Sequence, residues 1–258
     1  MWQTEKGGGW LQVVLGVLMA CAAALTPCKT HAADVKVAIA ANFTEPAKEI
    51  AAAFEKVSGH KLIMSFGATG QFYAQIAQGA PFDILLAADP ATPKKAIAEN
   101  LGVVGSSYTY ATGQLVLYSR DNNRIKGEAT LKDGNFTKLA LANPEIAPYG
   151  AAAMQAMQAL GVLDTLKPKF VTGNSIAQTY QFIETGNAEV GFVALSQVIA
   201  SDAGSRWIVP AKLHAPIAQD AVLLKSAGNE AAARSFLEFL RGPEARAVIT
   251  KFGYGTDG

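Results

Sequence analysis

The sequence predicts an α/β protein whose sheets are covered by helices on both faces. Short apolar runs of strand length alternate along the chain with segments whose apolar residues recur at helical spacing. Half of the 258 residues are hydrophobic and only 17% are charged, so the chain can bury a large core. The 22 Lys and Arg residues nearly balance the 21 Asp and Glu residues and form no long run, which argues against a nucleic-acid interface.

The first 32 residues stand outside this pattern. Residues 10–25 form an apolar run that Lys6 precedes, and Thr30-His31-Ala32 follows it as a small-x-small cleavage site. This layout is typical of a secretory signal peptide, and the run is short for a membrane span. We therefore expect residues 1–32 to be cleaved during export to the periplasm. Lipoprotein processing at Cys21 is a less favoured alternative, because Met19 fits a lipobox poorly.

Removal of this segment would also remove Cys21 and Cys28, the only cysteines of the chain. Thiol catalysis, disulfides and Cys-ligated metals are then excluded. His60 and His214 would be the only histidines left, which argues against a His-rich metal site. We expect no cofactor.

Nine apolar runs are the expected strands, in chain order 35–41, 61–66, 83–87, 114–119, 138–142, 169–172, 190–195, 206–209 and 221–225. Eight segments between and after them have helical periodicity, namely 45–57, 70–78, 93–99, 150–160, 176–185, 196–202, 230–241 and 243–251. Because strands and helices alternate, we expect mostly parallel sheets. Asp83 and Asp89 flank one strand and are expected to be caps or surface residues.

Four segments share one pattern: a strand, a short polar or glycine-containing turn, and a helix start. They are residues 41–44, 67–70, 147–150 and 173–176, and none contains Lys or Arg. In an open α/β sheet such turns fall at the carboxyl ends of strands, where ligands bind. Each helix start offers unpaired N–H groups and the positive end of a dipole. The four turns together are consistent with an anion held by neutral donors.

A serine hydrolase is the alternative from a different class. Residues 173–177 approximate the nucleophile elbow G-x-S-x-G around Ser175, and Asp202 and His214 follow in the order Ser, Asp, His. The order is easily met by chance, however, and no HGGG-like oxyanion segment precedes the elbow.

At the four turns the sequence resembles the periplasmic molybdate-binding proteins of ABC importers, which have the type II periplasmic-binding-protein fold. The resemblance covers residues 34–258 and rests on segments such as GAPFD, NPEIAPYG, AEVGFVALSQV and FLRGPEARAVITKFGY. It implies two lobes, each a mostly parallel sheet flanked by helices, joined by a two-segment hinge near residues 111–115 and 216–220. Lobe 1 would comprise residues 33–113 and 218–258, and lobe 2 residues 114–217.

The resemblance also implies the ligand contacts. The positions that match the family's contacts are Asn42, Thr69, Tyr149 and Ile176. Many members carry a tyrosine where this chain has Ala194, and the Tyr149 hydroxyl is a candidate replacement donor. The oxyanion would be held through these groups, with no direct coordination of its metal atom by the protein.

The function implied is capture of molybdate, and also tungstate, by a monomer that delivers the ion to an ABC permease in the inner membrane. Such a protein is not an enzyme. Sulfate or another tetrahedral oxyanion is the alternative ligand.

Overall fold

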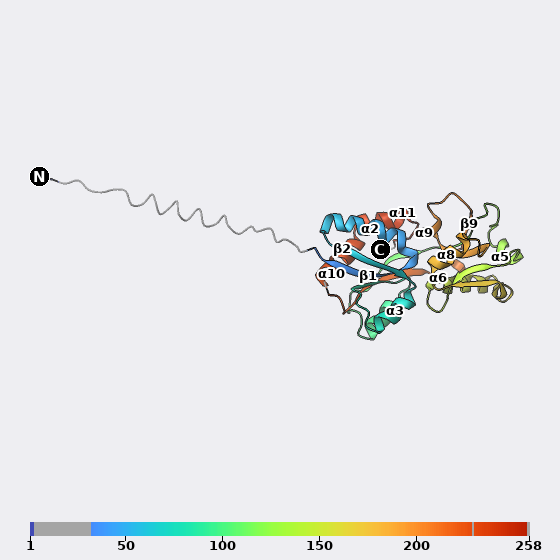
Figure 1. Ribbon diagram of the computed structural model, residues 1–258, viewed down its shortest axis with the longest axis horizontal. Coiled ribbons are helices and arrows are strands. Elements are labelled where there is room, and N and C mark those ends of the chain that lie inside the picture. Colours follow the sequence, from blue (N-terminus) through green and yellow to red (C-terminus); the bar gives the residue numbers. More distant parts are fainter. Residues whose placement is uncertain (3–31, 229, 257–258) are drawn as a thin grey trace. The chain divides into compact units, whose positions relative to one another are not determined.

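Two five-stranded sheets organise the computed structural model, which describes residues 1–2, 32–228 and 230–256 (Figure 1). The first sheet has the order β2-β1-β3-β10-β4 and the second β7-β6-β8-β5-β9. The strands of the first sheet are β1 (Asp34–Ala40), β2 (Lys61–Gly67), β3 (Ile84–Leu86), β4 (Tyr108–Gly113) and β10 (Ile217–Leu223). Those of the second are β5 (Leu115–Ser119), β6 (Leu139–Ala142), β7 (Phe170–Gly173), β8 (Val190–Ala194) and β9 (Ser205–Ile208).

Both sheets are mixed, which corrects the expectation of mostly parallel pairing. Strand β1 is parallel to β2 and β3, whereas β10 is antiparallel to β3 and β4. Likewise β6 is parallel to β7 and β8, whereas β5 is antiparallel to β8 and β9. The strands at the crossings between the sheets account for the antiparallel pairs, because the chain leaves and returns in opposite directions.

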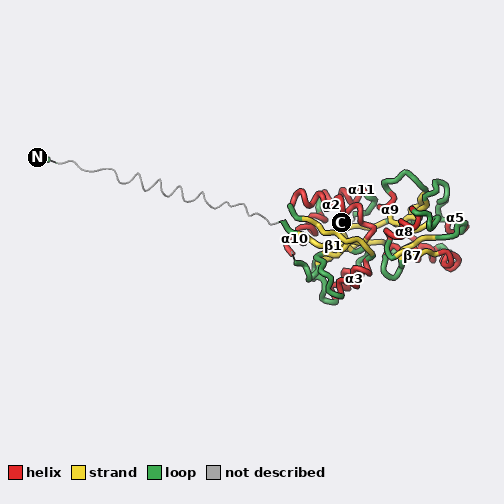
Figure 2. The backbone as a smooth tube through the Cα atoms, in the orientation of Figure 1, coloured by secondary structure: helices red, strands yellow, loops and turns green. Residues whose placement is uncertain are grey.

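Helices cover both sheets, as the tube in Figure 2 shows. The first sheet carries α2 (Thr44–Ser58), α3 (Thr69–Ala77), α4 (Ala91–Ala98), α10 (Glu230–Arg241) and α11 (Pro243–Lys251). The second carries α5 (Ala129–Asp133), α6 (Pro148–Ala159), α7 (Leu163–Leu166), α8 (Ile176–Glu184) and α9 (Leu195–Val198). Short 3₁₀ turns complete the set at η1 (Ala41–Phe43), η2 (Lys167–Lys169) and η3 (Ala211–Leu213).

Alternation along the strands buries both faces of each sheet. In β3, Ile84 and Leu86 pack in the cluster of α2, α10 and α11, whereas Leu85 packs in the cluster of α3. In β5, Leu117 contributes to the α6 cluster and Val116 to the cluster with α9. Successive side chains of a strand point to opposite faces, so a sheet with helices on both sides needs apolar residues throughout.

The chain crosses between the sheets twice, at Gln114 between β4 and β5, and at residues 209–216 between β9 and β10. We call each sheet with its helices a lobe, lobe 1 containing β1, and we call β4 and β10 the hinge strands. Both lobes belong to one compact unit, Ala32–Gly258. The expected signal peptide and its Cys21 alternative lie outside the described residues. Among the helices that the structure describes, none has the length and apolar character needed to cross a membrane.

Candidate anion-binding site

Residues from all four predicted turns line one small cavity at the carboxyl ends of strands β1, β2, β6 and β7. Its empty volume, counted together with the open solvent space at its mouth, is about 210 Å³. Lobe 1 contributes the ends of β1 and β2, and lobe 2 contributes the starts of α6 and α8. The lining residues are Ala40, Ala41, Asn42, Gly67, Ala68, Thr69, Ala88, Ala147, Pro148, Tyr149 and Ile176.

The electrostatics of this cavity come from the backbone. Helices α3, α6 and α8 begin at Thr69, Pro148 and Ile176, and η1 leads into α2. The first N–H groups of a helix have no acceptor within it, and they carry the positive end of the helix dipole. No lining residue is ionisable at neutral pH, and in the described part of the chain no cluster of three or more His, Cys, Asp or Glu residues could hold a metal ion. The arrangement can hold an anion through neutral donors.

Thr69 is placed to donate its hydroxyl hydrogen. It is the first residue of α3 and is 1% exposed. Its Oγ1 accepts a hydrogen bond from the backbone N–H of Ala88 at 3.0 Å. A hydroxyl has one donor and two acceptor lone pairs, so this contact leaves the hydrogen available for a ligand in the cavity.

Asn42 lines the cavity, but its carboxamide nitrogen is engaged elsewhere. Its Nδ2 donates to Gln219 Oε1 at 2.9 Å and to the Tyr254 hydroxyl at 3.0 Å. A carboxamide has two N–H bonds, so both are satisfied within the protein. The side-chain donor is therefore engaged within the protein, and the contact of Asn42 with an oxyanion stays a prediction.

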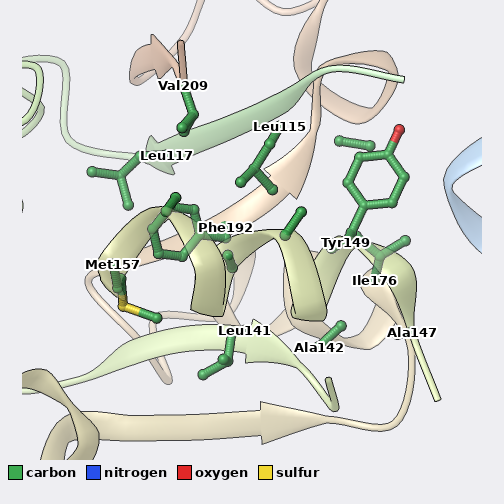
Figure 3. Packing of buried hydrophobic residues seen from close by; sticks show 14 of the residues in the cluster. Leu115, Leu117, Leu141, Ala142, Ala147, Tyr149, Met157, Ile176, Phe192 and Val209 are labelled. Atoms are coloured by element: carbon green, nitrogen blue, oxygen red, sulfur yellow. The ribbon is translucent and has the colours of Figure 1, made fainter. Parts of the chain in front are cut away.

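Tyr149 is also brought to the cavity, as the second residue of α6. Its side chain is 2% exposed, and Gln219 Nε2 donates to its hydroxyl at 3.4 Å. Figure 3 shows the ring at the margin of the apolar cluster, with the hydroxyl directed away from Leu141 and Met157. The hydroxyl therefore lies at the hinge strands, and the backbone N–H of Tyr149 is the group that belongs to the helix start.

Ile176 is the first residue of α8 and is 4% exposed. The preceding Ser175 is the N-cap, and its hydroxyl accepts from the Gln178 N–H at 3.3 Å. This cap fixes the direction of the helix start and satisfies one of its N–H groups.

The two lobes touch directly beside the cavity. The backbone N–H of Gly70 in lobe 1 donates to the Ile146 carbonyl in lobe 2 at 2.9 Å. On the other side, the Ser196 hydroxyl of lobe 2 donates to the Asn42 carbonyl of lobe 1 at 2.8 Å. The lobes are therefore closed over the cavity.

The alternative hydrolase residues have separate surroundings. Ser175 is a helix cap, Asp202 lies in an exposed turn, and His214 Nδ1 is 2.7 Å from the Ala215 carbonyl. Within residues 32–228, no hydrogen bond or ion pair joins the three side chains.

Sequence reasoning missed the polar residues behind the cavity: Tyr110, Ser196, Gln219 and Tyr254. All four are buried and hydrogen-bonded to one another or to Asn42. They come from four distant parts of the chain, so no local pattern joins them. The available signal was the family resemblance, whose quoted segments include Ser196 and Tyr254.

Comparisons with known proteins agree with this geometry. Residues 35–255 match the family model of the bacterial extracellular solute-binding proteins. The chain belongs to this family.

Two relatives extend the match over nearly the whole chain. The molybdate-binding protein ModA of Rhodobacter capsulatus is 50% identical over 256 residues, covering 99% of this chain and 98% of that protein. The molybdate-binding protein ModA of Azotobacter vinelandii is 50% identical over 243 residues, covering 93% of this chain and 96% of that protein. Because these relatives are binding proteins, the chain is assigned as a binding protein and not an enzyme.

A solved structure gives the same result for the fold. The periplasmic molybdate-binding protein of Azotobacter vinelandii superposes with a TM-score of 0.84 at 37% sequence identity, covering 87% of this chain and 100% of that chain. The expected two-lobed α/β fold of periplasmic binding proteins is thereby confirmed.

Proposed function

We propose that the protein captures molybdate between its lobes and delivers it to an ABC permease in the inner membrane. The observation that carries this proposal is the convergence of four helix-start turns without Lys or Arg on one cavity. Each helix end supplies roughly half a positive charge, so four of them balance a dianion. The names of the relatives identify molybdate as the first dianion to test.

The site residues of this proposal are Asn42, Thr69, Tyr149 and Ile176. Thr69 donates through its hydroxyl, and each of the four turns offers backbone N–H groups. The protein contacts only the oxygen atoms of the ion, because donors and no metal-ligating side chains line the cavity. No other cofactor takes part.

Selectivity follows from the same lining. Fixed neutral donors select a tetrahedral oxyanion by size. Tungstate is nearly the size of molybdate, so we expect it to bind as well. A protonated phosphate also carries a donor hydrogen, for which the lining offers no carboxylate acceptor.

The test is a thermal-shift and calorimetry panel with molybdate, tungstate, chromate, sulfate and phosphate. A ligand present at about 100 times its Kd adds about 2.7 kcal/mol to the free energy of unfolding. We expect such stabilisation from molybdate and tungstate and little from sulfate or phosphate. An equal shift with sulfate would reassign the protein to sulfate or to oxyanions in general.

Location and partner form part of the proposal. Residues 1–32 act as the cleaved signal peptide, and the mature protein works outside the cytoplasmic membrane as a monomer. Closure of the lobes buries the ion and creates the surface that the permease recognises.

A further inference from the structure

A buried polar cluster lies directly behind the cavity, with Gln219 at its centre. Gln219 is 0% exposed. Its Oε1 accepts from Asn42 Nδ2 at 2.9 Å and from the Tyr110 hydroxyl at 3.1 Å, and its Nε2 donates to the Tyr149 hydroxyl at 3.4 Å. One side chain therefore contacts the first turn of lobe 1 and the third turn of lobe 2.

Gln219 lies on a hinge strand, so this link can respond to movement of the lobes. Gln219 belongs to hinge strand β10, and the register between β10 and hinge strand β4 shifts between Gln219 and Asp220. Such an irregularity bends a strand locally and redirects its side chains. Gln219 therefore lies at the irregular point of a hinge strand, and its amide contacts a residue of each lobe at the cavity.

The second hinge strand is shaped to receive Tyr149. A Cβ atom on Gly113, the last residue of β4, would lie 2.0 Å from the Tyr149 hydroxyl oxygen and 2.8 Å from Gln219 Nε2. Any residue other than glycine would collide with the phenol in the closed arrangement. Gly113 and Gln219 therefore form a socket on the two hinge strands for a side chain of lobe 2.

We propose that Gln219 is a positioning residue that latches the closed state, by joining Asn42 of lobe 1 to Tyr149 of lobe 2. The proposal rests on the proposed function in one respect: the cavity that the latch closes is the oxyanion site. Opening of the lobes withdraws Tyr149 from the socket and releases the Gln219 Nε2 donor. Closure restores both contacts and aligns the turns that hold the ion.

The cluster keeps one protonation state across the neutral range. Burial raises the pKa of Tyr110 and of Tyr149 well above the ordinary value, and it raises the pKa of Tyr254 to about 12. The hydroxyls consequently remain neutral donors, and the latch does not depend on pH near neutrality.

The test measures lobe closure and ligand release in the same set of variants. The exported chain is expected to have no cysteine, so spin labels can be placed through Lys94→Cys on α4 and Gln158→Cys on α6, two exposed positions on opposite lobes. The distance distribution is recorded without ligand and with saturating tungstate. The tungstate dissociation rate is measured by stopped flow for Gln219→Met, Tyr149→Phe and the double variant.

Tyr110→Phe is the matched control. It removes a hydroxyl that donates to the same Gln219 oxygen and to the Ala87 carbonyl, both of which lie in lobe 1 or its hinge strand. It contacts nothing in lobe 2 through this hydroxyl. We expect Tyr110→Phe to lower stability but to leave closure and release unchanged.

We expect Gln219→Met and Tyr149→Phe each to lengthen the inter-lobe distance in ligand-free protein and to speed tungstate release by about 2- to 12-fold. The double variant should be no faster than the faster single variant, because both changes cut the same link. The latch would be overturned if the two substitutions had additive effects on the tungstate dissociation rate. It would also be overturned if the variants had the same inter-lobe distances and dissociation rates as the parent. Should Gln219→Met fail to fold, Tyr149→Phe alone carries the same comparison with Tyr110→Phe.

Failure of the latch and failure of the proposed function give different results. If the parent binds sulfate rather than tungstate, the function is reassigned. The inter-lobe distances and dissociation rates are then measured with sulfate, and they still test the latch. The inter-lobe distances in the ligand-free protein test the latch without any anion. If tungstate binds tightly and the variants close as the parent does, the proposed function is supported and the latch is rejected.

Discussion

Thr69 is the side chain whose contribution to the site follows from a single contact. Its oxygen accepts from the Ala88 N–H, so its hydrogen stays available for a ligand in the cavity that Thr69 lines. We expect Thr69→Val, which keeps the shape and removes the hydroxyl, to weaken molybdate binding by about 1.5–3 kcal/mol, or about 10- to 150-fold. Calorimetry measures this change.

Thr69→Ser is the matched control, because it keeps the hydroxyl and loses only a methyl group. It should bind within a few-fold of the parent. If Thr69→Val binds as tightly as Thr69→Ser, the hydroxyl does not donate to the ion, and the α3 turn acts through its backbone alone.

The buried tyrosines give the protein a defined response to alkali. The pKa of Tyr254 is raised to about 12 by burial, and burial also raises the pKa values of Tyr110 and Tyr149 well above the ordinary value. A group whose pKa is higher in the folded state stabilises the fold fully below its unfolded value, which is about 10 for tyrosine. That stability is lost as pH rises through the folded value.

We therefore expect the free energy of unfolding, measured in urea at a series of pH values, to change little on account of these groups until about pH 10 and to fall between about pH 10 and 12. Tyr254→Phe should make the fall shallower. A fall that is complete below about pH 9 would contradict this assignment.

At the scale of elements, the site depends on how closely α6 approaches the end of β6. A Cβ atom on Gly150 would lie 2.1 Å from the Ala142 carbonyl oxygen, which is a backbone atom that cannot move aside alone. We expect Gly150→Ala to displace the start of α6, to lower the free energy of unfolding by about 1–3 kcal/mol, and to weaken molybdate binding at least about 10-fold. Chemical denaturation and calorimetry measure the two effects.

Gly228→Ala serves as the control, since a Cβ there meets nothing within 4 Å. It should leave both binding and stability near the parent values. If Gly150→Ala also binds like the parent, the third turn is not held by this contact.

Local patterns predicted the elements that carry many apolar residues. All nine expected strands and all eight expected helices are present; α10 and α11 have the expected ends, and each of the others is shifted at one end or both. Strand β4 was missed because YTYATG mixes threonine and glycine with its aromatic residues, and α5 and α7 were missed because they are too short to display a helical period. The start of β10 was missed because Gln219 and Asp220 are polar, although both are buried.

Contacts between segments that are far apart in the chain could not be predicted from the sequence. Asp89 lies just before the N-cap residue Pro90, and its carboxylate accepts from the Thr92 N–H in the first turn of α4 at 2.6 Å, close to the expected capping role. Asp83 is different: it is 4% exposed, and it accepts from the backbone of Lys36 at 2.6 Å and of Gly228 at 2.8 Å. Its partners lie 47 and 145 positions away, so no spacing rule could distinguish this buried anchor from a surface residue. The same holds for the Asn42 side chain, whose Nδ2 partners, Gln219 and Tyr254, lie 177 and 212 positions away.

For the whole molecule, the absence of charged side chains from the cavity lining sets the response to salt. In the proposed function the donors are backbone groups and hydroxyls enclosed by the two lobes, and buried interactions are screened much less than exposed ones. We expect the Kd for molybdate to change by no more than about threefold between about 0.05 and 0.5 M sodium chloride. Calorimetry at these two salt concentrations tests this. A steep loss of affinity would indicate that a Lys or Arg side chain reaches the ion.

The place of β10 in the sheet also determines the order in which the two lobes can fold during synthesis. Strand β10 lies between β3 and β4, so lobe 1 lacks an interior strand until residues 217–223 have been synthesised, whereas every strand of lobe 2 lies within residues 115–208. Domains fold as units as their residues emerge. We expect a chain truncated after residue 216 and released from the ribosome to protect lobe 2 from protease while residues 33–113 are digested. Lobe 1 would thus stay unfolded, and accessible to chaperones and proteases, until residues 217–223 have been synthesised, although its first strands are made before any strand of lobe 2.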